Sequence, residues 1–453
     1  MSAMSENQIL KTSTMRKERV ARQRAAQAPR EAHSSIGSAL GGVRLITQAV
    51  VASLLLAFCQ RELVGLLVNG LGLEGFTGDQ SLALFSFVTI PFVVTVLHGP
   101  RPAVAAGTIA SLILWGATHF NPCTLVSSFS GVVLMAALAR RVRKVSDLAV
   151  FALDVFLLQS VGSLAMVALR NKFAPELDAC EAWQIGALAI NSFLAVPVSL
   201  MAALPLAERF SGCTSDYTLA TYANLENTLL ERLSREAPGT YGHSMVVADL
   251  AAAAAESIGA NPLLARLGGY YHDIGKLSNP RFFMENQSLL GNPHDTLPPS
   301  ISAMIVASHV KDGSILARDN GLPPPIARII ASHHGTTAME WFRRKAIKQA
   351  AEKGEPAAAD EWPYRYAGPI PESREETIVS LADTVEAASR SIAAPTRSDL
   401  VRLVNGIVAS RFADGQLARS ALSLRELEEV KRSFVLTLVH RLHVRAAYPD
   451  QRK

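Results

Sequence analysis

Apolar segments that approach the length of a membrane span are confined to the first 205 residues of this 453-residue chain. An α-helix needs about 20 predominantly apolar residues to cross the hydrocarbon core of a bilayer. The segments lie at 45–60, 80–98, 102–119, 123–139, 147–169 and 183–205. We predict a bundle of about six transmembrane helices, with five as the alternative, because Gln60, Arg61 and Glu62 interrupt the first stretch. The mean hydropathy of +0.20 agrees with a chain that lies partly in lipid.

Charged residues alternate in sign between successive connections of the predicted spans. Basic residues fill the N-terminal tail, the connection at Arg101 and the cluster Arg140, Arg141, Arg143 and Lys144. The other connections carry Glu62, Glu74, Asp79, Glu176, Asp178 and Glu181. Since cytoplasmic connections are enriched in Lys and Arg, we predict a multi-pass protein with both termini in the cytoplasm. The net charge of +5 follows from these basic residues, and no basic groove with interleaved aromatic residues predicts nucleic-acid binding.

The composition changes after residue 205, and four regions follow from this change. We predict a disordered basic cytoplasmic tail over 1–42, a transmembrane bundle over 43–205, a helical linker over 206–238 and a cytoplasmic domain over 239–453. Apolar residues of the C-terminal domain recur with helical spacing and without the alternation typical of strands. The predicted fold class is therefore all-α.

The four cysteines show no spacing typical of a zinc site or of a disulfide framework. Free, buried thiols are the favoured interpretation for Cys59, Cys123, Cys180 and Cys213. The predicted topology places Cys123 and Cys180 near the outer surface, so a disulfide between these two is an open alternative.

Prolines and capping residues mark the expected starts of five helices in the C-terminal domain. The positions are Thr240, then Asn261 with Pro262, then Pro298 to Ser300, then Pro323 to Pro325, and last a capping box of Ser373 and Glu376. Gly275 is expected to let the chain leave the second helix. Residues 343–362 lack an apolar period and are predicted to form an exposed loop.

Histidine and aspartate residues fall on or next to all five of these helices. They are His243, His272, Asp273, His309, His333, His334 and Asp383. Seven nitrogen and oxygen ligands suit two divalent metal ions that share a bridging carboxylate. Such a pair of ions can lower the pKa of a water molecule and direct the resulting hydroxide at a phosphodiester. Because no thiolate belongs to the set, Mn²⁺ and Fe²⁺ are favoured over structural zinc.

Seven motifs follow one another in order along the C-terminal domain. They are Tyr241-Gly242-His243-Ser244, Tyr271-His272-Asp273-Ile274-Gly275-Lys276, Glu285-Asn286-Gln287, Asn292-Pro293-His294-Asp295, Ser308-His309-Val310-Lys311-Asp312-Gly313, His333-His334-Gly335-Thr336-Thr337 and Leu381-Ala382-Asp383. Over nearly all of 206–450 this order resembles the seven-transmembrane HD family of bacterial membrane phosphohydrolases. The resemblance implies an HD-type domain, a place in the bacterial cytoplasmic (inner) membrane, and hydrolysis of the second messenger cyclic di-AMP to 5'-pApA.

The resemblance also implies a role for each residue at a matching position. One metal ion would be held by His243, His272 and Asp383, and the other by His309, His333 and His334. Asp273 would bridge the two ions as a catalytic carboxylate. Lys276, the second catalytic residue, would stabilise the charge of the transition state or hold a substrate phosphate.

The chain departs from that family at two points. Members usually carry an extracytoplasmic sensor domain, for which the short approach to the first apolar run leaves no room, so sensing of an external signal is not expected. Gly242 stands where the family often has a histidine, although the ligand set itself is complete.

Two further pairs of charged residues lie near these motifs. Glu386 and Arg390, one and two turns after Asp383, are expected to form an ion pair on the helix surface. His294 and Asp295 repeat the His-Asp dipeptide in a loop, where they are expected to cap or anchor that loop rather than bind metal.

Three functions remain open from the sequence. The leading one is a membrane-anchored cyclic di-AMP phosphodiesterase. The second keeps the metal centre but acts on (p)ppGpp or cyclic di-GMP, because the motifs specify the reaction centre and not the base pocket. The third is a non-catalytic nucleotide-binding membrane receptor, against which the complete ligand set counts. The expected partners are a cyclic dinucleotide, the lipid bilayer and a second copy of the chain in a homodimer.

Overall fold

The computed structural model describes residues 45–54, 84–117, 122–138, 203–287, 291–353, 362–392 and 394–443, with residue 201 and a few single residues between 150 and 161. It divides the chain into two compact units, Met1–Cys213 and Thr214–Lys453. Within these described ranges every regular element is a helix, and an isolated β-bridge joins Ala338 to Arg365. The predicted all-α fold class is confirmed for this part of the chain.

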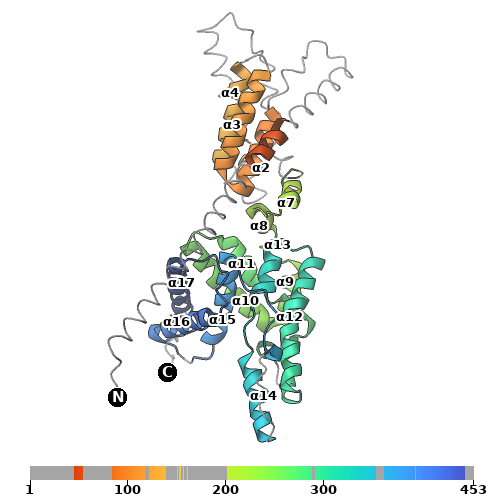
Figure 1. Cartoon of the computed structure of the whole chain (residues 1–453), viewed down its shortest axis with the longest axis vertical. Coiled ribbons are helices and arrows are strands. Elements are labelled where there is room, and N and C mark those ends of the chain that lie inside the picture. Colours follow the sequence, from red (N-terminus) through yellow and green to blue (C-terminus); the bar gives the residue numbers. More distant parts are fainter. Residues whose placement is uncertain are drawn as a thin grey trace, which may run out of the picture. The chain divides into compact units, whose positions relative to one another are not determined.

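Three helices of the first unit pack against one another: α2 (Leu84–His98), α3 (Pro100–Ala117) and α4 (Pro122–Leu138). They are labelled in the orange part of Figure 1, and they coincide with three of the predicted apolar runs. Gly107 allows α3 to approach α4, because a Cβ atom there would lie 2.5 Å from the side chain of Val132. A short helix, α7 (Leu204–Ser211), follows.

No helix in the described part of the chain has both the length and the apolar character needed to cross a bilayer. The tail 1–42 and most of the predicted spans at 147–169 and 183–205 lie outside the described residues, as do Cys59 and Cys180. Cys213 is a free thiol, as predicted, but it is half-buried and not buried.

The second unit is built from helices (Figure 1). Among its described residues, the buried apolar side chains form two large clusters and a smaller one. The α-helices are α8 (Asp216–Thr221), α9 (Thr228–Glu236), α10 (Pro238–Ser257), α11 (Pro262–Tyr271), α12 (Pro299–Asp319), α13 (Pro324–Ser332), α14 (Glu340–Glu352), α15 (Arg374–Ser389), α16 (Arg397–Ala413) and α17 (Leu424–His443). Short 3₁₀ helices lie between them: η3 (Ile274–Ser278), η4 (Pro280–Phe282), η5 (Met284–Asn286), η6 (Pro293–Asp295) and η7 (Trp362–Tyr364).

The two large apolar clusters hold the helices that carry the predicted ligands. One cluster joins α10 and α15 to α16 and α17, with Phe434 among its fully buried side chains. The other joins α11 and α13 to α8 and α9 through Leu229, Leu230 and Tyr271. Full burial of each such side chain contributes roughly 1.5–3 kcal/mol relative to exposure. Helices α8 and α9, within the range predicted as a linker, therefore pack onto the second unit.

Three of the expected helix starts are confirmed. Asn261 caps α11 and accepts hydrogen bonds from the backbone N–H groups of Leu263 and Leu264 at 3.0 and 3.1 Å. Helices α12 and α13 each begin with a proline in the first turn, where a missing N–H leaves no hydrogen bond unmade.

The cap of α15 is only half of the predicted capping box. Ser373 accepts a hydrogen bond from the N–H of Glu376, as expected. The Glu376 carboxylate accepts from the backbone N–H of Glu372, however, and its second partner is Ser332. The box does not close on Ser373 because this buried carboxylate is used to tie α15 to the end of α13.

Two other local predictions are wrong. Helix α10 begins at Pro238 and not at Thr240, whose hydroxyl instead donates to Glu285 at 3.0 Å. The predicted loop 343–362 begins within helix α14, while 354–361 lies outside the described residues. Good helix formers and ion pairs such as Arg344 with Glu340 stabilise α14 without an apolar period.

Gly275 was expected to let the chain leave the helix, and this prediction is wrong. The glycine instead lets the backbone of η3 pack closely against α12. The chain continues past Gly275 as η3, which packs on α12. A Cβ atom at Gly275 would lie 1.8 Å from the carbonyl oxygen of His309 and 2.4 Å from the backbone nitrogen of Gly313. Only glycine fits here, and the contact sets the distance between η3, which directly follows Asp273, and α12, which carries His309.

Candidate metal centre

The structure brings all seven predicted metal ligands together. They form two groups, the first of His243, His272 and Asp383 and the second of Asp273, His309, His333 and His334. The ligand atoms lie within 4.8 Å of one another in each group. Six of the side chains are buried, and only His334 is partly exposed. Five helices of the second unit, or the residues directly after them, supply the set.

The first group joins α10, α11 and α15. His243 Nε2 lies 3.1 Å from Asp383 Oδ1, and His272 Nε2 lies 3.8 Å from the same oxygen. The ring of His272 meets that of His243 edge to face, with centroids 5.3 Å apart. Both histidines therefore present Nε2 to one carboxylate oxygen.

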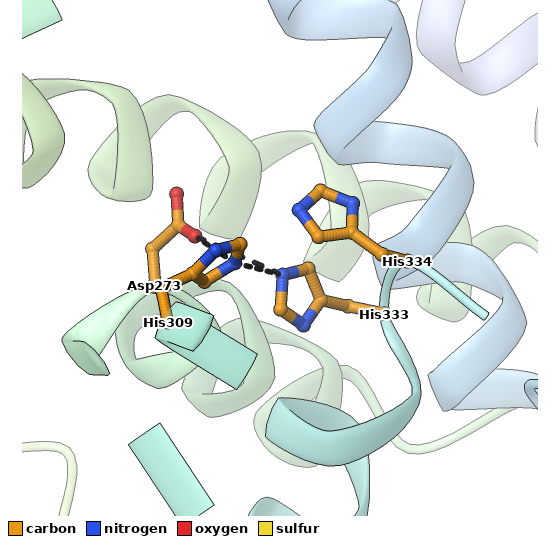
Figure 2. A group of neighbouring side chains, drawn as sticks. All are labelled: Asp273, His309, His333 and His334. Atoms are coloured by element: carbon orange, nitrogen blue, oxygen red, sulfur yellow. Dashed lines mark hydrogen bonds and ion pairs between the residues drawn. The ribbon is translucent and has the colours of Figure 1, made fainter. Parts of the chain in front are cut away.

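The second group gathers side chains from α12 and from the end of α13 around Asp273, as Figure 2 shows. Asp273 Oδ1 lies 3.3 Å from His309 Nε2 and 3.7 Å from His333 Nε2. The two Nε2 atoms are themselves 3.3 Å apart. His334 completes the group, although its Nδ1 also lies 3.6 Å from Asp383 Oδ2.

Asp273 lies between the two groups and offers one oxygen to each. Its Oδ1 faces the second group, whereas its Oδ2 lies 3.2 Å from His272 Nε2 and 3.6 Å from His243 Nε2. A carboxylate placed in this way can bridge two cations.

Hydrogen bonds to the backbone fix the orientation of three of the histidines. The Nδ1 atoms of His272, His309 and His333 each donate to the carbonyl oxygen three residues earlier, at 2.8, 2.6 and 2.8 Å. In the neutral ring the other nitrogen, Nε2, then carries the lone pair. All three lone pairs point toward Asp273, which is itself an acceptor.

This arrangement leaves buried acceptors without a donor. His272 Nε2 and Asp273 Oδ1 have no hydrogen-bond partner, and both atoms are shielded from water. A buried polar atom without a partner costs about 1–3 kcal/mol. A cation among the converging nitrogen and carboxylate lone pairs would remove that cost, so these side chains fit a pair of divalent metal ions.

His243 differs from the other histidines because its Nδ1 contacts a carboxylate. Glu386 Oε2 lies 2.5 Å from His243 Nδ1, and Glu386 is only 3% exposed. The ion pair of Glu386 with Arg390 is present at 2.6 Å. The ion pair was predicted to lie on the helix surface. This is wrong for the Glu386 carboxylate, which is buried because its face of α15 packs against α10.

Lys276 reaches the centre from η3. Its Nζ lies 2.7 Å from Asp273 Oδ2 and 2.8 Å from Glu285 Oε1, and its side chain is 12% exposed. Glu285 also accepts a hydrogen bond from the hydroxyl of Thr240. The lysine is thus held against the carboxylate between the two groups.

The two aspartates of the centre are ionised. Burial raises the pKa of Asp273, but its electrostatic interactions with His272 and Lys276 outweigh burial and hold this pKa well below its usual range. Burial likewise raises the pKa of Asp383, and hydrogen bonding to His243 outweighs it, so that this pKa is also lowered. Lys276 stays protonated because Asp273 and Glu285 outweigh the effect of burial and raise its pKa.

The histidines of the two groups differ in protonation. Burial lowers the pKa of His333 to about 3 and the pKa of His334 well below its ordinary value. Burial alone would also lower the pKa of His243, but hydrogen bonds to Asp383 and Glu386 outweigh it and raise this pKa to about 10. Without a metal ion, His243 is therefore a positively charged imidazolium at neutral pH, whereas His333 is a neutral imidazole with its one proton on Nδ1.

Metal binding is therefore expected to release a proton from only one group. A metal ion needs a deprotonated imidazole, so binding at His243 expels its proton and the affinity rises about tenfold per pH unit up to the pKa. Binding at His333 has no such dependence. Calorimetric titration with Mn²⁺ at pH 7.5, in two buffers of different ionisation enthalpy, counts the protons. Equal release at both positions, or no release, would contradict this assignment.

Sequence reasoning missed three residues of the site. Tyr366 stacks on His334 with ring centroids 4.2 Å apart, and burial raises the pKa of its phenol, which stays protonated. Glu285 contacts Lys276 from η5. Glu386 contacts His243 from α15, the helix that also carries Asp383. The nearest sequence signal for Glu386 is its position one turn after Asp383, on the same face of the helix.

The second His-Asp pair anchors a loop, as predicted. His294 is buried, and its Nε2 donates to the carbonyl oxygen of Phe282 at 2.8 Å. Lys345 of α14 donates to the carbonyl oxygen of His294, and the ring of Phe342 packs edge to face on the imidazole. Trp341 is 57% exposed.

Two family models match the chain. One, described as HD domain, matches residues 240–388, and the other, described as 7TM receptor with intracellular HD hydrolase, matches residues 33–215. The first match contains all seven residues of the centre.

Curated relatives match both parts of the chain together. The cyclic-di-AMP phosphodiesterase PgpH of Bacillus subtilis (strain 168) is 36% identical over 329 residues, which are 73% of this chain and 44% of that protein. The cyclic-di-AMP phosphodiesterase PgpH of Listeria monocytogenes serotype 1/2a (strain 10403S) is 36% identical over 369 residues, which are 81% of this chain and 48% of that protein. The chain thus spans about half the length of these relatives.

Among solved structures, the chain is similar to the HD domain of L. monocytogenes phosphodiesterase PgpH in complex with cyclic-di-AMP. The sequences are 41% identical, the match covers 48% of this chain and 99% of that one, and the TM-score is 0.46. From the two family models and the relatives together, we conclude that the chain belongs to the family of 7TM receptors with an intracellular HD hydrolase.

Proposed function

We propose that this protein is a membrane-anchored, metal-dependent phosphodiesterase that hydrolyses cyclic di-AMP to 5'-pApA. The observation that carries the proposal is the buried centre, in which the Nε2 atoms of three histidines point toward Asp273. His272 Nε2 and Asp273 Oδ1 have no hydrogen-bond partner there. Relatives that are named cyclic-di-AMP phosphodiesterases support the choice of substrate.

The ligands of the two metal ions are part of this proposal. One ion would be held by His243, His272 and Asp383, the other by His309, His333 and His334, with Asp273 between them. When bound, two divalent ions supply a nucleophile at neutral pH and neutralise charge on the phosphate. Donors of nitrogen and oxygen without thiolate favour Mn²⁺ or Fe²⁺.

The protein residues prepare the centre for this reaction. The backbone carbonyl groups that accept hydrogen bonds from Nδ1 of His272, His309 and His333 fix the orientation of each ring. The Nε2 lone pairs are therefore oriented for metal binding in advance. Lys276 places a permanent positive charge beside Asp273, where it can stabilise negative charge on a phosphate in the transition state. Burial of the centre excludes bulk water and strengthens these electrostatic interactions.

The membrane assignment also remains a proposal. We propose that residues 43–205 form a transmembrane bundle of about six helices that follows a cytoplasmic tail over 1–42, and that 206–238 links the bundle to a cytoplasmic HD domain over 239–453. The match of residues 33–215 to a 7TM family model and the alternation of charged connections support it. A homodimer is a further prediction.

The test of the proposed function is a comparison of substrates. The full 453-residue chain, purified in a mild detergent and loaded with Mn²⁺ or Fe²⁺, is offered cyclic di-AMP, cyclic di-GMP and (p)ppGpp in parallel. We expect kcat/KM to be highest for cyclic di-AMP, with 5'-pApA as the product. Hydrolysis of another nucleotide alone would keep the metal centre and refute the substrate. A metal-loaded chain that hydrolyses none of the three would favour a nucleotide-binding receptor.

Removal of the metal ions is expected to lower stability as well as activity. A ligand that binds only the folded state at 100 times its Kd stabilises that state by about 2.7 kcal/mol. For a domain of this size we therefore expect a chelator to lower the unfolding midpoint by at least about 5 °C. Scanning calorimetry with and without added Mn²⁺ measures the shift. An unchanged midpoint in the wild-type chain would contradict metal binding to the folded state.

A further inference from the structure

We propose that Glu386, anchored by Arg390, positions His243 as a metal ligand and strengthens metal binding by the group of His243, His272 and Asp383. The inference rests on the metal centre of the proposed function and adds to it two residues that do not bind metal themselves.

The contacts behind the histidine rings set His243 apart. His272, His309 and His333 each donate from Nδ1 to a neutral backbone carbonyl. His243 instead meets the Glu386 carboxylate at 2.5 Å, at a buried position. Because an anionic acceptor behind the ring makes its other nitrogen a stronger donor to a metal ion, His243 is the most strongly donating of these four ligands.

Glu386 contacts the ring on the side away from the proposed metal position. Its Oε2 faces Nδ1, whereas the Nε2 of the same ring faces Asp383 Oδ1 at 3.1 Å. The carboxylate therefore fixes which nitrogen carries the lone pair and does not compete for the metal ion. It is a positioning residue that acts through His243.

Arg390 uses the second oxygen of the same carboxylate. Its Nε and Nη2 lie 2.7 and 2.6 Å from Glu386 Oε1. Asp383 and Glu386 lie on α15 and Arg390 is its C-cap residue. Their spacings of three and four residues place them on one side of the helix. This helix and its C-terminal cap thus supply a ligand, the group that orients a second ligand, and the cation that pairs with that group.

The substitution Glu386→Gln tests the carboxylate with little change in shape. An amide has one oxygen, and the guanidinium of Arg390 attracts it. The amide NH₂ then faces His243 Nδ1 and favours the tautomer with a proton on Nε2, which cannot bind a metal ion. We expect the affinity of the His243 group for Mn²⁺ to fall by about 10–100-fold, and that of the other group to change by less than about twofold. Glu386→Asp keeps the charge but shortens the reach, so a smaller loss in the same group is expected.

Glu376→Gln is the matched control. Glu376 lies on the same helix, is 5% exposed, and is also paired with an arginine, Arg328, at 3.5 Å. It contacts none of the four side chains His243, His272, Asp383 and Glu386 in the contacts described for α15. We expect this variant to retain the affinity of the His243 group within about twofold. Circular dichroism of each full-length variant in detergent checks that it is folded.

A double-mutant cycle asks whether Glu386 acts through His243. Mn²⁺ titration, followed by calorimetry and by the electron paramagnetic resonance signal of free Mn²⁺, is compared for Glu386→Gln, His243→Ala and the double variant. If the proposal holds, Glu386→Gln causes no further loss once His243 is gone. An equal loss in both backgrounds, or full affinity of both groups in Glu386→Gln, would overturn it. The readout is metal affinity, so a chain that binds two Mn²⁺ ions but does not hydrolyse cyclic di-AMP would refute the proposed function alone.

Discussion

Substitution of Asp273 by Asn is expected to reduce the kcat of cyclic di-AMP hydrolysis by about 10³-fold or more, or by about 4 kcal/mol of transition-state stabilisation. Asp273 offers one oxygen to each ligand group and contacts Lys276 through Oδ2. An amide has one oxygen and no charge, so the variant can neither bridge two cations nor hold the lysine. Steady-state turnover of the Mn²⁺-loaded full chain measures the effect.

The chain supplies a control for this variant in its second His-Asp pair. Asp295 follows His294 on η6, is exposed, and contacts none of the seven residues of the centre. Turnover by Asp295→Asn should remain within about twofold of the wild-type value. The assigned role of Asp273 would be refuted if Asp273→Asn retained more than about a tenth of the wild-type kcat at saturating metal.

Substitution of Gly275 by Ala is expected to destabilise the second unit by about 3 kcal/mol or more, because the added methyl group would overlap backbone atoms that cannot move independently. The nearest of these is the carbonyl oxygen of His309, at 1.8 Å, followed by the nitrogen of Gly313, at 2.4 Å. Relief of the overlap would push η3 from α12 and separate Asp273 from His309. We expect a fall of about 6 °C or more in the unfolding midpoint, and a loss of Mn²⁺ affinity.

Gly406→Ala is the same chemical change, but it is expected to raise the stability of the fold and not to lower it. Gly406 lies inside α16, is exposed, and a Cβ atom there would meet no atom within 4 Å. Alanine in an open helical position is expected to stabilise the fold by about 0.5–1 kcal/mol. A Gly275→Ala variant as stable as Gly406→Ala would show that the approach of η3 to α12 is not as tight as described.

The parts of the fold that the sequence predicted are those set by local chemistry. The start of α11 depends on an asparagine cap followed by proline, and the starts of α12 and α13 on prolines that fit the first turn. These signals act within a few residues and need no knowledge of the tertiary structure. The order of the motifs was equally informative, because the structure brings together all seven predicted ligand residues.

The errors arise where tertiary contacts decide the outcome. The spacing of Glu386 and Arg390 predicted their ion pair correctly, but only the packing of α15 on α10 buries Glu386 against His243, which lies 143 residues away in the chain. Thr240 was predicted to cap a helix, but its hydroxyl donates a hydrogen bond to Glu285 of η5, which is distant in the sequence. Helix α14 was missed because it is stabilised by propensity and ion pairs, whereas the prediction relied on apolar periodicity.

The central claim is that this centre uses water to open the phosphodiester ring of cyclic di-AMP. The most direct test is hydrolysis by the Mn²⁺-loaded full chain in water enriched in ¹⁸O, followed by mass spectrometry of the product. The proposed function predicts linear 5'-pApA with one ¹⁸O atom in its terminal phosphate, and no such product from Asp273→Asn. Unchanged cyclic di-AMP in the presence of bound metal, or a product without ¹⁸O, would contradict it.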